Sequence, residues 1–309
     1  MESVFDGVQM GTGTWQWGDT VFWGYDKTEG EQKALAAFDR SLALGITLLD
    51  TAEIYGVGMS EKIIGKGVMA ERLRATPRPF KLASKFAPLP HRVTRMQFRA
   101  ALTRTLKRLT INRLDLYQIH WTHPLVSEEF YANLLAEALN EELISAAGVS
   151  NYNRAQVIRA HHTLTLRGFE LASNQVEYHL LERKIERDGT FEACRERGIR
   201  VIAYSPLAMG LLTGKYTPEN PPPGLRGRKY ASVLAKVQPL IALLREIGAQ
   251  YGEKTPAQVA LNWVMCKGAI PIPGAKNADH VQMNSGALGW KLSDDDMAAL
   301  DAMSERVTQ

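Results

Sequence analysis

Cysteine is scarce in this sequence. The chain of 309 residues has only two, Cys194 and Cys266, and they lie far apart in segments with a helical pattern. Neither has a second cysteine or a histidine at the spacing of a metal site, so the sequence predicts no metal centre and no disulfide framework. Free thiols, buried in a protein of a reducing compartment, are the simplest interpretation.

Long apolar runs are also missing. No apolar stretch approaches the roughly 18 residues that a helix needs to cross a bilayer, so we expect no membrane contact. The first ten residues, MESVFDGVQM, lack the basic and apolar regions of a signal peptide. The sequence therefore predicts a cytoplasmic protein.

The excess of charge of one sign is small. The net charge is +4, and the basic residues do not gather into one stripe. We therefore expect no nucleic acid as a partner, whereas a small anionic ligand is compatible with the charge. Nothing in the sequence indicates the oligomeric state.

Eight short apolar segments alternate with segments of helical periodicity. They read as continuous apolar runs, which is typical of parallel strands buried on both faces. The predicted strands span residues 8–15, 46–52, 80–86, 114–121, 144–151, 171–179, 199–207 and 269–275. Helix starts are predicted at Thr28, Ser60, Thr94 and Thr255, and glycine helix ends at Gly45 and Gly198.

Eight such units with right-handed crossovers close into a barrel. A doubly wound sheet would favour the motif G-x-G-x-x-G after the first strand, but here Gly11 and Gly13 are followed by Gln16. We therefore predict an α/β fold, a single (β/α)8 TIM-barrel domain over residues 1–309, with an extra C-terminal helix from Ser293.

Ionisable side chains sit where the predicted strands end. Asp50, Lys85 and His120 end the second, third and fourth strands, and Tyr55 follows Asp50 in the next loop. Alone, each has an ordinary explanation as a helix cap, a solvated charge or a core histidine. In a barrel, however, these strand ends meet at one mouth, so their joint placement indicates a site.

These four groups suit acid–base chemistry. A free tyrosine has a pKa of about 10, and a neighbouring ammonium favours its ionised form, so Lys85 is expected to lower the pKa of Tyr55. Asp50 can compensate the charge of Lys85, and His120 can hydrogen-bond a substrate oxygen. A proton-donating tyrosine suits the reduction of a carbonyl, for which the hydride comes from elsewhere.

Several motifs resemble the aldo-keto reductase family: LLDTAEIYGVGMSEKIIG, ASKF, LDLYQIHW, GVSNY, NQVEYH, AYSPLAMGLLTGKY and PIPGAK. The resemblance runs from Gly11 to about Leu288. It implies NADPH-dependent reduction of an aldehyde or ketone, with Asp50, Tyr55, Lys85 and His120 as the catalytic tetrad. It also implies contacts of the cofactor, NADPH or NADP⁺, with Thr14, Trp15, Ser150, Asn151, Gln175, Tyr204, Ser205, Pro206, Leu207, Gly210, Lys215, Gly274, Lys276, His280 and Asn284.

The resemblance also locates a substrate pocket. Trp15, Trp17, Tyr25 and Trp121 are expected to face a small carbonyl substrate, whereas Phe22 and Trp23 are expected to pack the loop. A long loop is predicted over about residues 207–235, after strand seven. Its Pro- and Gly-rich part, residues 213–232, also contains Arg226, Arg228 and Lys229 and predicts a mobile basic cover over an anionic cofactor. The family often has glutamate before Asn284, and this chain has Met283 there.

Two other functions are compatible with these residues. Relatives of this fold include cofactor-binding regulatory subunits, for which reductase activity would be weak. A lysine at a strand end can also form a Schiff base, as in aldolases. The neighbouring Asp50 and Tyr55 favour a charged lysine that is not a nucleophile.

Overall fold

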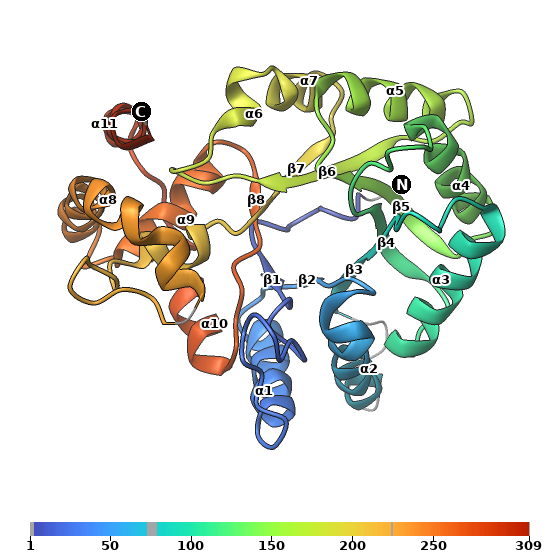
Figure 1. The fold of residues 1–309 in the computed structure, drawn as a ribbon, viewed down its shortest axis with the longest axis horizontal. Helices are drawn as coiled ribbons and strands as arrows, with labels where there is room; N and C mark the ends of the chain where they lie inside the picture. Colours follow the sequence, from blue (N-terminus) through green and yellow to red (C-terminus); the bar gives the residue numbers. More distant parts are fainter. Residues whose placement is uncertain (1–2, 73–78, 224, 309) are drawn as a thin grey trace.

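Eight parallel strands form one sheet at the centre of the molecule, and the helices surround it (Figure 1). This computed structural model describes residues 3–72, 79–223 and 225–308 of the chain. The strands follow one another in the sheet in chain order from β1 to β8. A parallel bridge between Gly13 and Gly274 joins the two ends of the sheet, which is thus nearly closed into a barrel. The predicted (β/α)8 fold is confirmed.

All eight predicted strands are present, and each is shorter than predicted. They are β1 (Gly11–Gly13), β2 (Leu48–Asp50), β3 (Lys81–Phe86), β4 (Leu114–Ile119), β5 (Ile144–Ser150), β6 (Leu171–Glu177), β7 (Arg200–Tyr204) and β8 (Ile270–Pro271). β8 is very short because Pro271 and Pro273 have no N–H to donate to a neighbouring strand.

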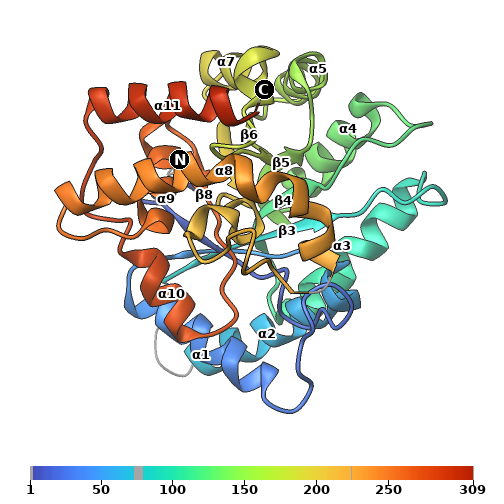
Figure 2. The same ribbon diagram turned by 60° about the vertical axis from the view of Figure 1, so that its left-hand side comes forward.

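Helices follow the strands around the barrel. They are α1 (Gly30–Ala43), α2 (Met59–Arg72), α3 (Arg95–Leu109), α4 (Glu128–Asn140), α5 (Arg154–Thr165), α6 (Lys184–Arg187), α7 (Thr190–Glu196), α8 (Leu225–Gln250), α9 (Pro256–Cys266), α10 (Ala278–Ser285) and α11 (Asp294–Thr308). Two short 3₁₀ turns, η1 (Tyr55–Gly58) and η2 (Ala208–Thr213), follow β2 and β7. The predicted C-terminal helix is α11, which packs beside α8 (Figure 2).

The barrel interior has an apolar layer below a polar one. Leu48, Ala83, Leu116 and Ile202 are buried together with Val4, Phe5 and Val8 of the N-terminal segment. Two residues further along the same strands come Asp50, Lys85, Gln118 and Tyr204. Because side chains alternate along a strand, each of these lies on the same face as the apolar residue before it. The strands thus carry their polar groups to one end of the barrel.

Three of the four predicted helix starts are confirmed to within one residue, two of them with their caps. Thr94 and Thr255 each accept a hydrogen bond from the backbone three residues on, in complete capping boxes. The prediction for Thr28 is wrong, because its N–H and hydroxyl both donate to Asp26, and α1 begins at Gly30 without a side-chain cap. α2 begins at Met59, one residue before the predicted start at Ser60, with Glu61 in its first turn, and the hydroxyl of Ser60 contacts Thr14 and Thr51.

The loop after β7 ends earlier than predicted. η2 and an irregular stretch follow β7, but α8 begins at Leu225, so the predicted loop is wrong over residues 225–235. That stretch, LRGRKYASVLA, consists mostly of residues with good helix propensity. The side chains of Arg226, Arg228 and Lys229 lie outside the described part of the structure.

Within residues 3–72, 79–223 and 225–308, no helix is long and apolar enough to cross a membrane.

The turn after Tyr55 has an unusual backbone. Gly56, Val57 and Gly58 all have positive φ, which glycine adopts freely but a β-branched residue rarely does. A Cβ on Gly56 would lie 2.7 Å from the backbone of Gly18, so the loops after β1 and β2 meet without side chains between them. Val57 is 94% exposed and gains little packing for its strain.

We expect Val57→Asn to raise the free energy of unfolding by about 1 kcal/mol, because asparagine tolerates the left-handed conformation. Urea unfolding of both proteins measures the difference. Val21→Asn is the matched control, since Val21 is 90% exposed but has no positive φ, and its change is expected to stay within about 0.5 kcal/mol. Equal effects of the two substitutions would show that Val57 stores no strain.

Candidate active site

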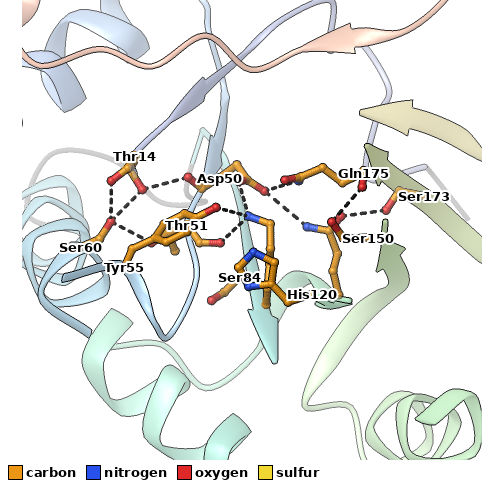
Figure 3. Close-up of polar contacts among 12 residues, drawn as sticks. Thr14, Asp50, Thr51, Tyr55, Ser60, Ser84, His120, Ser150, Ser173 and Gln175 are labelled. Carbon is orange, nitrogen blue, oxygen red and sulfur yellow. Dashed lines mark hydrogen bonds and ion pairs between the residues drawn. The ribbon is translucent and has the colours of Figure 1, made fainter. Parts of the chain in front are cut away.

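A buried ion pair lies at the polar end of the barrel. The ammonium of Lys85 donates to a carboxylate oxygen of Asp50 and to the carbonyl of Thr51 (2.9 Å; Figure 3). The side chains of Lys85 and Asp50 are 0% and 2% exposed. Burial alone would lower the pKa of Lys85, but Asp50 and Tyr55 raise it above its usual value. Lys85 is therefore charged at neutral pH.

Tyr55 lies directly above this pair. Its hydroxyl is 3.4 Å from the ammonium of Lys85. Burial raises the pKa of Tyr55, the charge of Lys85 lowers it only in part, and the resulting pKa is above the usual value. The contribution of Lys85 has the predicted sign, but the prediction that the pKa falls below its usual value is wrong. Tyr55 keeps its proton at neutral pH.

His120 forms the other side of the same mouth. Its ring centre is 5.8 Å from that of Tyr55, and the rings are nearly perpendicular. Burial and the nearby charge of Lys85 lower the pKa of His120 well below its usual value, so the ring is neutral. A neutral imidazole can offer one N–H to a substrate oxygen.

Gln175, which was predicted to contact the cofactor, binds the ion pair. Its amide donates to the second carboxylate oxygen of Asp50 (2.7 Å; Figure 3). Gln118 of β4 donates to the same oxygen (3.4 Å). Sequence reasoning missed Gln118. Its signal was a polar residue inside a buried strand, two positions before His120 and therefore on the same face.

A chain of hydroxyls supports the mouth from the side of β1. Thr14 donates to the carbonyl of Asp50 (2.9 Å), and Ser60 is 2.8 Å from the hydroxyls of both Thr14 and Thr51 (Figure 3). Thr14 was predicted to contact the cofactor, but its side chain is fully buried and committed to these bonds. Its role in the structure is to join β1 to β2.

Three residues predicted to bind nicotinamide form one connected group. The hydroxyl of Tyr204 donates to Asn151 (3.0 Å), and the amide of Asn151 donates to the carbonyl of His120 (3.0 Å). Ser150 donates to the backbone carbonyl of Gln175 (2.8 Å). This group links β4, β5, β6 and β7 at the mouth, next to Tyr55 and His120.

The backbone after β7 folds into a tight left-handed turn. Ser205, Ala208, Met209 and Gly210 all have positive φ, although three of them are not glycine. Pro206 is buried and Leu207 half-buried within the same turn, and Lys215 follows it on the surface. Strained turns of this kind are typical of ligand sites, and successive N–H groups in such a conformation can bind an anion.

Positive charge gathers where the chain leaves β8. The backbone N–H of Lys276 donates to the Nδ1 of His280 (3.3 Å). Burial lowers the pKa of His280, the charges of Lys276 and Lys215 lower it further, and Asp279 raises it in part. Asn277 caps α10, so the positive end of that helix lies there as well. Asn284 is buried on α10, Met283 is exposed, and Gly274 lies exposed before Lys276. The donor set fits a phosphate group.

An aromatic row lines the mouth. Trp15 stacks on Phe22 (centroids 5.2 Å apart) and faces Tyr55 (6.2 Å), while Trp121 lies 4.7 Å from His120. Trp23 packs edge-on against Trp15, and its carbonyl accepts from Lys276 (3.0 Å). Trp15 and Trp121 thus lie beside the ionisable groups.

Two other predicted substrate residues lie elsewhere. Trp17 is 1% exposed, and its indole N–H donates to the carbonyl of Ala275 (2.7 Å). The ring of Tyr25 lies against Gly30, where a Cβ would come within 2.7 Å of it. Both side chains pack the loop after β1 onto the barrel, because burying a large ring there stabilises the loop.

The chain belongs to the aldo/keto reductase family, whose model matches residues 9–305. A chloroplastic pyridoxal reductase of Arabidopsis thaliana is 40% identical over 300 residues, which cover 94% of this chain and 82% of that protein. Among solved structures, an aldo/keto reductase from Klebsiella pneumoniae in complex with NADP and acetate is 28% identical, with a TM-score of 0.74, over 96% of this chain and 91% of that one. The protein is therefore an oxidoreductase of the carbonyl-reducing type.

We expect Lys85→Met to lower the free energy of unfolding by roughly 3–5 kcal/mol, because it leaves the carboxylate of Asp50 buried without its cation. The double variant Asp50→Asn/Lys85→Met removes both charges and should recover much of this loss. Urea unfolding of the wild type, both single variants and the double variant measures the coupling. Additive losses would show that the pair does not interact.

Proposed function

We propose that this protein reduces an aldehyde or ketone to an alcohol with NADPH. The observation that carries the proposal is the hydroxyl of Tyr55, protonated at neutral pH and 3.4 Å from a charged lysine. It is a proton donor whose developing negative charge would be stabilised by Lys85. The neutral His120 beside it supplies a second hydrogen-bond donor for the same substrate oxygen.

Each residue has a defined part in this proposal. A nicotinamide cofactor, when bound, would be the source of the hydride for the carbonyl carbon. Tyr55 donates its proton to the carbonyl oxygen, and His120 orients that oxygen. Lys85 stabilises the phenolate that remains, and Asp50 keeps Lys85 in place and charged. Trp15 and Trp121 shield the reacting atoms from water, which strengthens these interactions.

The cofactor would extend from the mouth across the turns after β7 and β8. In this proposal Ser150, Asn151 and Tyr204, which are joined by hydrogen bonds at the mouth, would bind nicotinamide, and the left-handed turn at 205–210 would bind the pyrophosphate. Lys276 and His280, at the start of α10, would bind the 2′-phosphate. Structures of the Klebsiella pneumoniae relatives in complex with NADP and with NADPH support this choice.

An aromatic aldehyde such as pyridoxal is the proposed substrate class. The Arabidopsis relative is named a pyridoxal reductase, and two flat apolar rings lie at the mouth, Trp15 facing Tyr55 and Trp121 beside His120. A ring can stack there with its carbonyl toward the phenol. The cytoplasmic location stays a prediction, since that relative is named chloroplastic.

Loss of NADPH absorbance tests the proposal directly. The purified protein is mixed with NADPH and with pyridoxal, benzaldehyde or an aliphatic aldehyde, and turnover is followed. Steady turnover with a preference for the aromatic aldehydes is expected. Binding of NADPH without turnover on the whole panel would favour the regulatory-subunit alternative, and borohydride trapping of a substrate on Lys85 would favour the aldolase.

We expect Tyr55→Phe to reduce kcat for carbonyl reduction by about 10²–10⁴-fold, because it removes only the proton donor. The dissociation constant for NADPH, measured by fluorescence titration, should stay nearly unchanged. Tyr131→Phe is the matched control, since its hydroxyl donates to the carbonyl of Arg92, away from the mouth. Activity of Tyr55→Phe within a few-fold of wild type would reject the assignment.

We expect Lys276→Ala to weaken NADPH binding by about ten- to a hundredfold and to leave NADH binding almost unchanged, because only NADPH carries the 2′-phosphate. Dissociation constants for both cofactors are measured on the wild type and the variant. Lys254→Ala is a control for general charge, since Lys254 lies after α8 beside Trp290. Equal weakening of both cofactors would show that Lys276 does not bind the phosphate.

A further inference from the structure

Gln118 is a buried amide inside the barrel with two polar partners. It lies on β4, paired with Lys85 on one side and with Gly148 on the other. Its side chain is fully buried, and its Nε2 is 3.4 Å from the Oδ2 of Asp50. A buried amide without partners would destabilise the fold, so this environment has to satisfy it.

Ser173 and Gly148 determine how the amide is oriented. The hydroxyl of Ser173 donates to the Oε1 of Gln118 (3.3 Å), which leaves the N–H groups to face the carboxylate. Gly148 lies between them on β5, and a Cβ there would come within 2.4 Å of the Ser173 hydroxyl and 2.8 Å of the Gln118 side chain. The missing side chain of Gly148 makes the room in which the two residues meet.

Two amides therefore converge on one oxygen of Asp50. Gln175 donates to Oδ2 from β6, Gln118 donates to it from β4, and Lys85 donates to Oδ1. Gln175 is paired with Ser150 of β5, whereas Gln118 is paired with Gly148, two residues earlier on that strand. We infer that Gln118, oriented by Ser173, is a positioning residue that holds the Asp50 carboxylate for its partner Lys85, an inference that rests on the proposed reductase function.

Loss of the Gln118 amide should change the pKa of Tyr55 in one direction. The ionisable groups that face Tyr55 are Asp50, Lys85, His120 and Tyr204. The negative charge of Asp50 raises the pKa of Tyr55, and the N–H dipoles of the amides offset part of that charge. Removing the Gln118 amide leaves more of the field of Asp50 acting on the phenol. The pKa of Tyr55 should then rise.

The pH profile of kcat/KM for carbonyl reduction at saturating NADPH tests the inference. Reduction needs protonated Tyr55, so activity falls as the pH rises through the pKa of this group. In Gln118→Met, which keeps the length of the side chain but has no N–H, this alkaline limb should move up by roughly half a pH unit or more. Ser173→Ala, which keeps the amide but frees it to turn, should move it in the same direction by less.

Leu116→Val is the matched control, because Leu116 is buried on the same face of β4, two residues away, without a polar contact to Asp50. The alkaline limb of the pH profile of Leu116→Val should stay at the wild-type position. The inference would be overturned if Gln118→Met lost stability or kcat while the alkaline limb of its pH profile stayed at the wild-type position. If Gln118→Met does not fold, the position of the same limb in Ser173→Ala decides. Wild type without any turnover would instead reject the proposed function.

Discussion

The buried pair of Lys85 and Asp50 is the interaction on which the mouth of this barrel depends. A charged lysine with no exposed surface is stable only with a carboxylate beside it, and that carboxylate needs donors of its own. Gln175 and Gln118 supply them from β6 and β4, and Thr51 accepts from the lysine. The pair and its partners therefore join β2, β3, β4 and β6 next to Tyr55.

Burial gives the site its protonation states. It keeps the proton on Tyr55 despite the neighbouring ammonium, and with Lys85 it keeps His120 neutral. Both groups can then donate hydrogen bonds to one substrate oxygen. Simple sequence reasoning expected the charge of the lysine to dominate, but in a water-poor site the loss of hydration of the phenolate is the larger effect.

Much of this arrangement could be predicted from the sequence because it follows local periodicity. Buried parallel strands leave continuous apolar runs, and the residues that end them, such as Asp50 and Lys85, fall at one mouth once the barrel is assumed. Where tertiary contacts compete with local signals, the predictions failed. Thr28 donates its hydrogen bonds to Asp26 and does not cap α1, and α8 extends over a stretch that was predicted as a loop. Gln118 was missed because a single polar residue in an apolar strand has no motif.

The contact between Lys276 and Trp23 joins the loop after β8 to the loop after β1. The ammonium donates to the carbonyl of Trp23 and lies 5.5 Å from the centre of its ring, and Trp23 packs against Trp15. One side chain thus serves both the proposed phosphate site and the aromatic row that would receive the substrate. A substitution of Lys276 that changed the cofactor preference would also remove a contact that holds Trp23 against Trp15. Cofactor preference and substrate range would therefore change together.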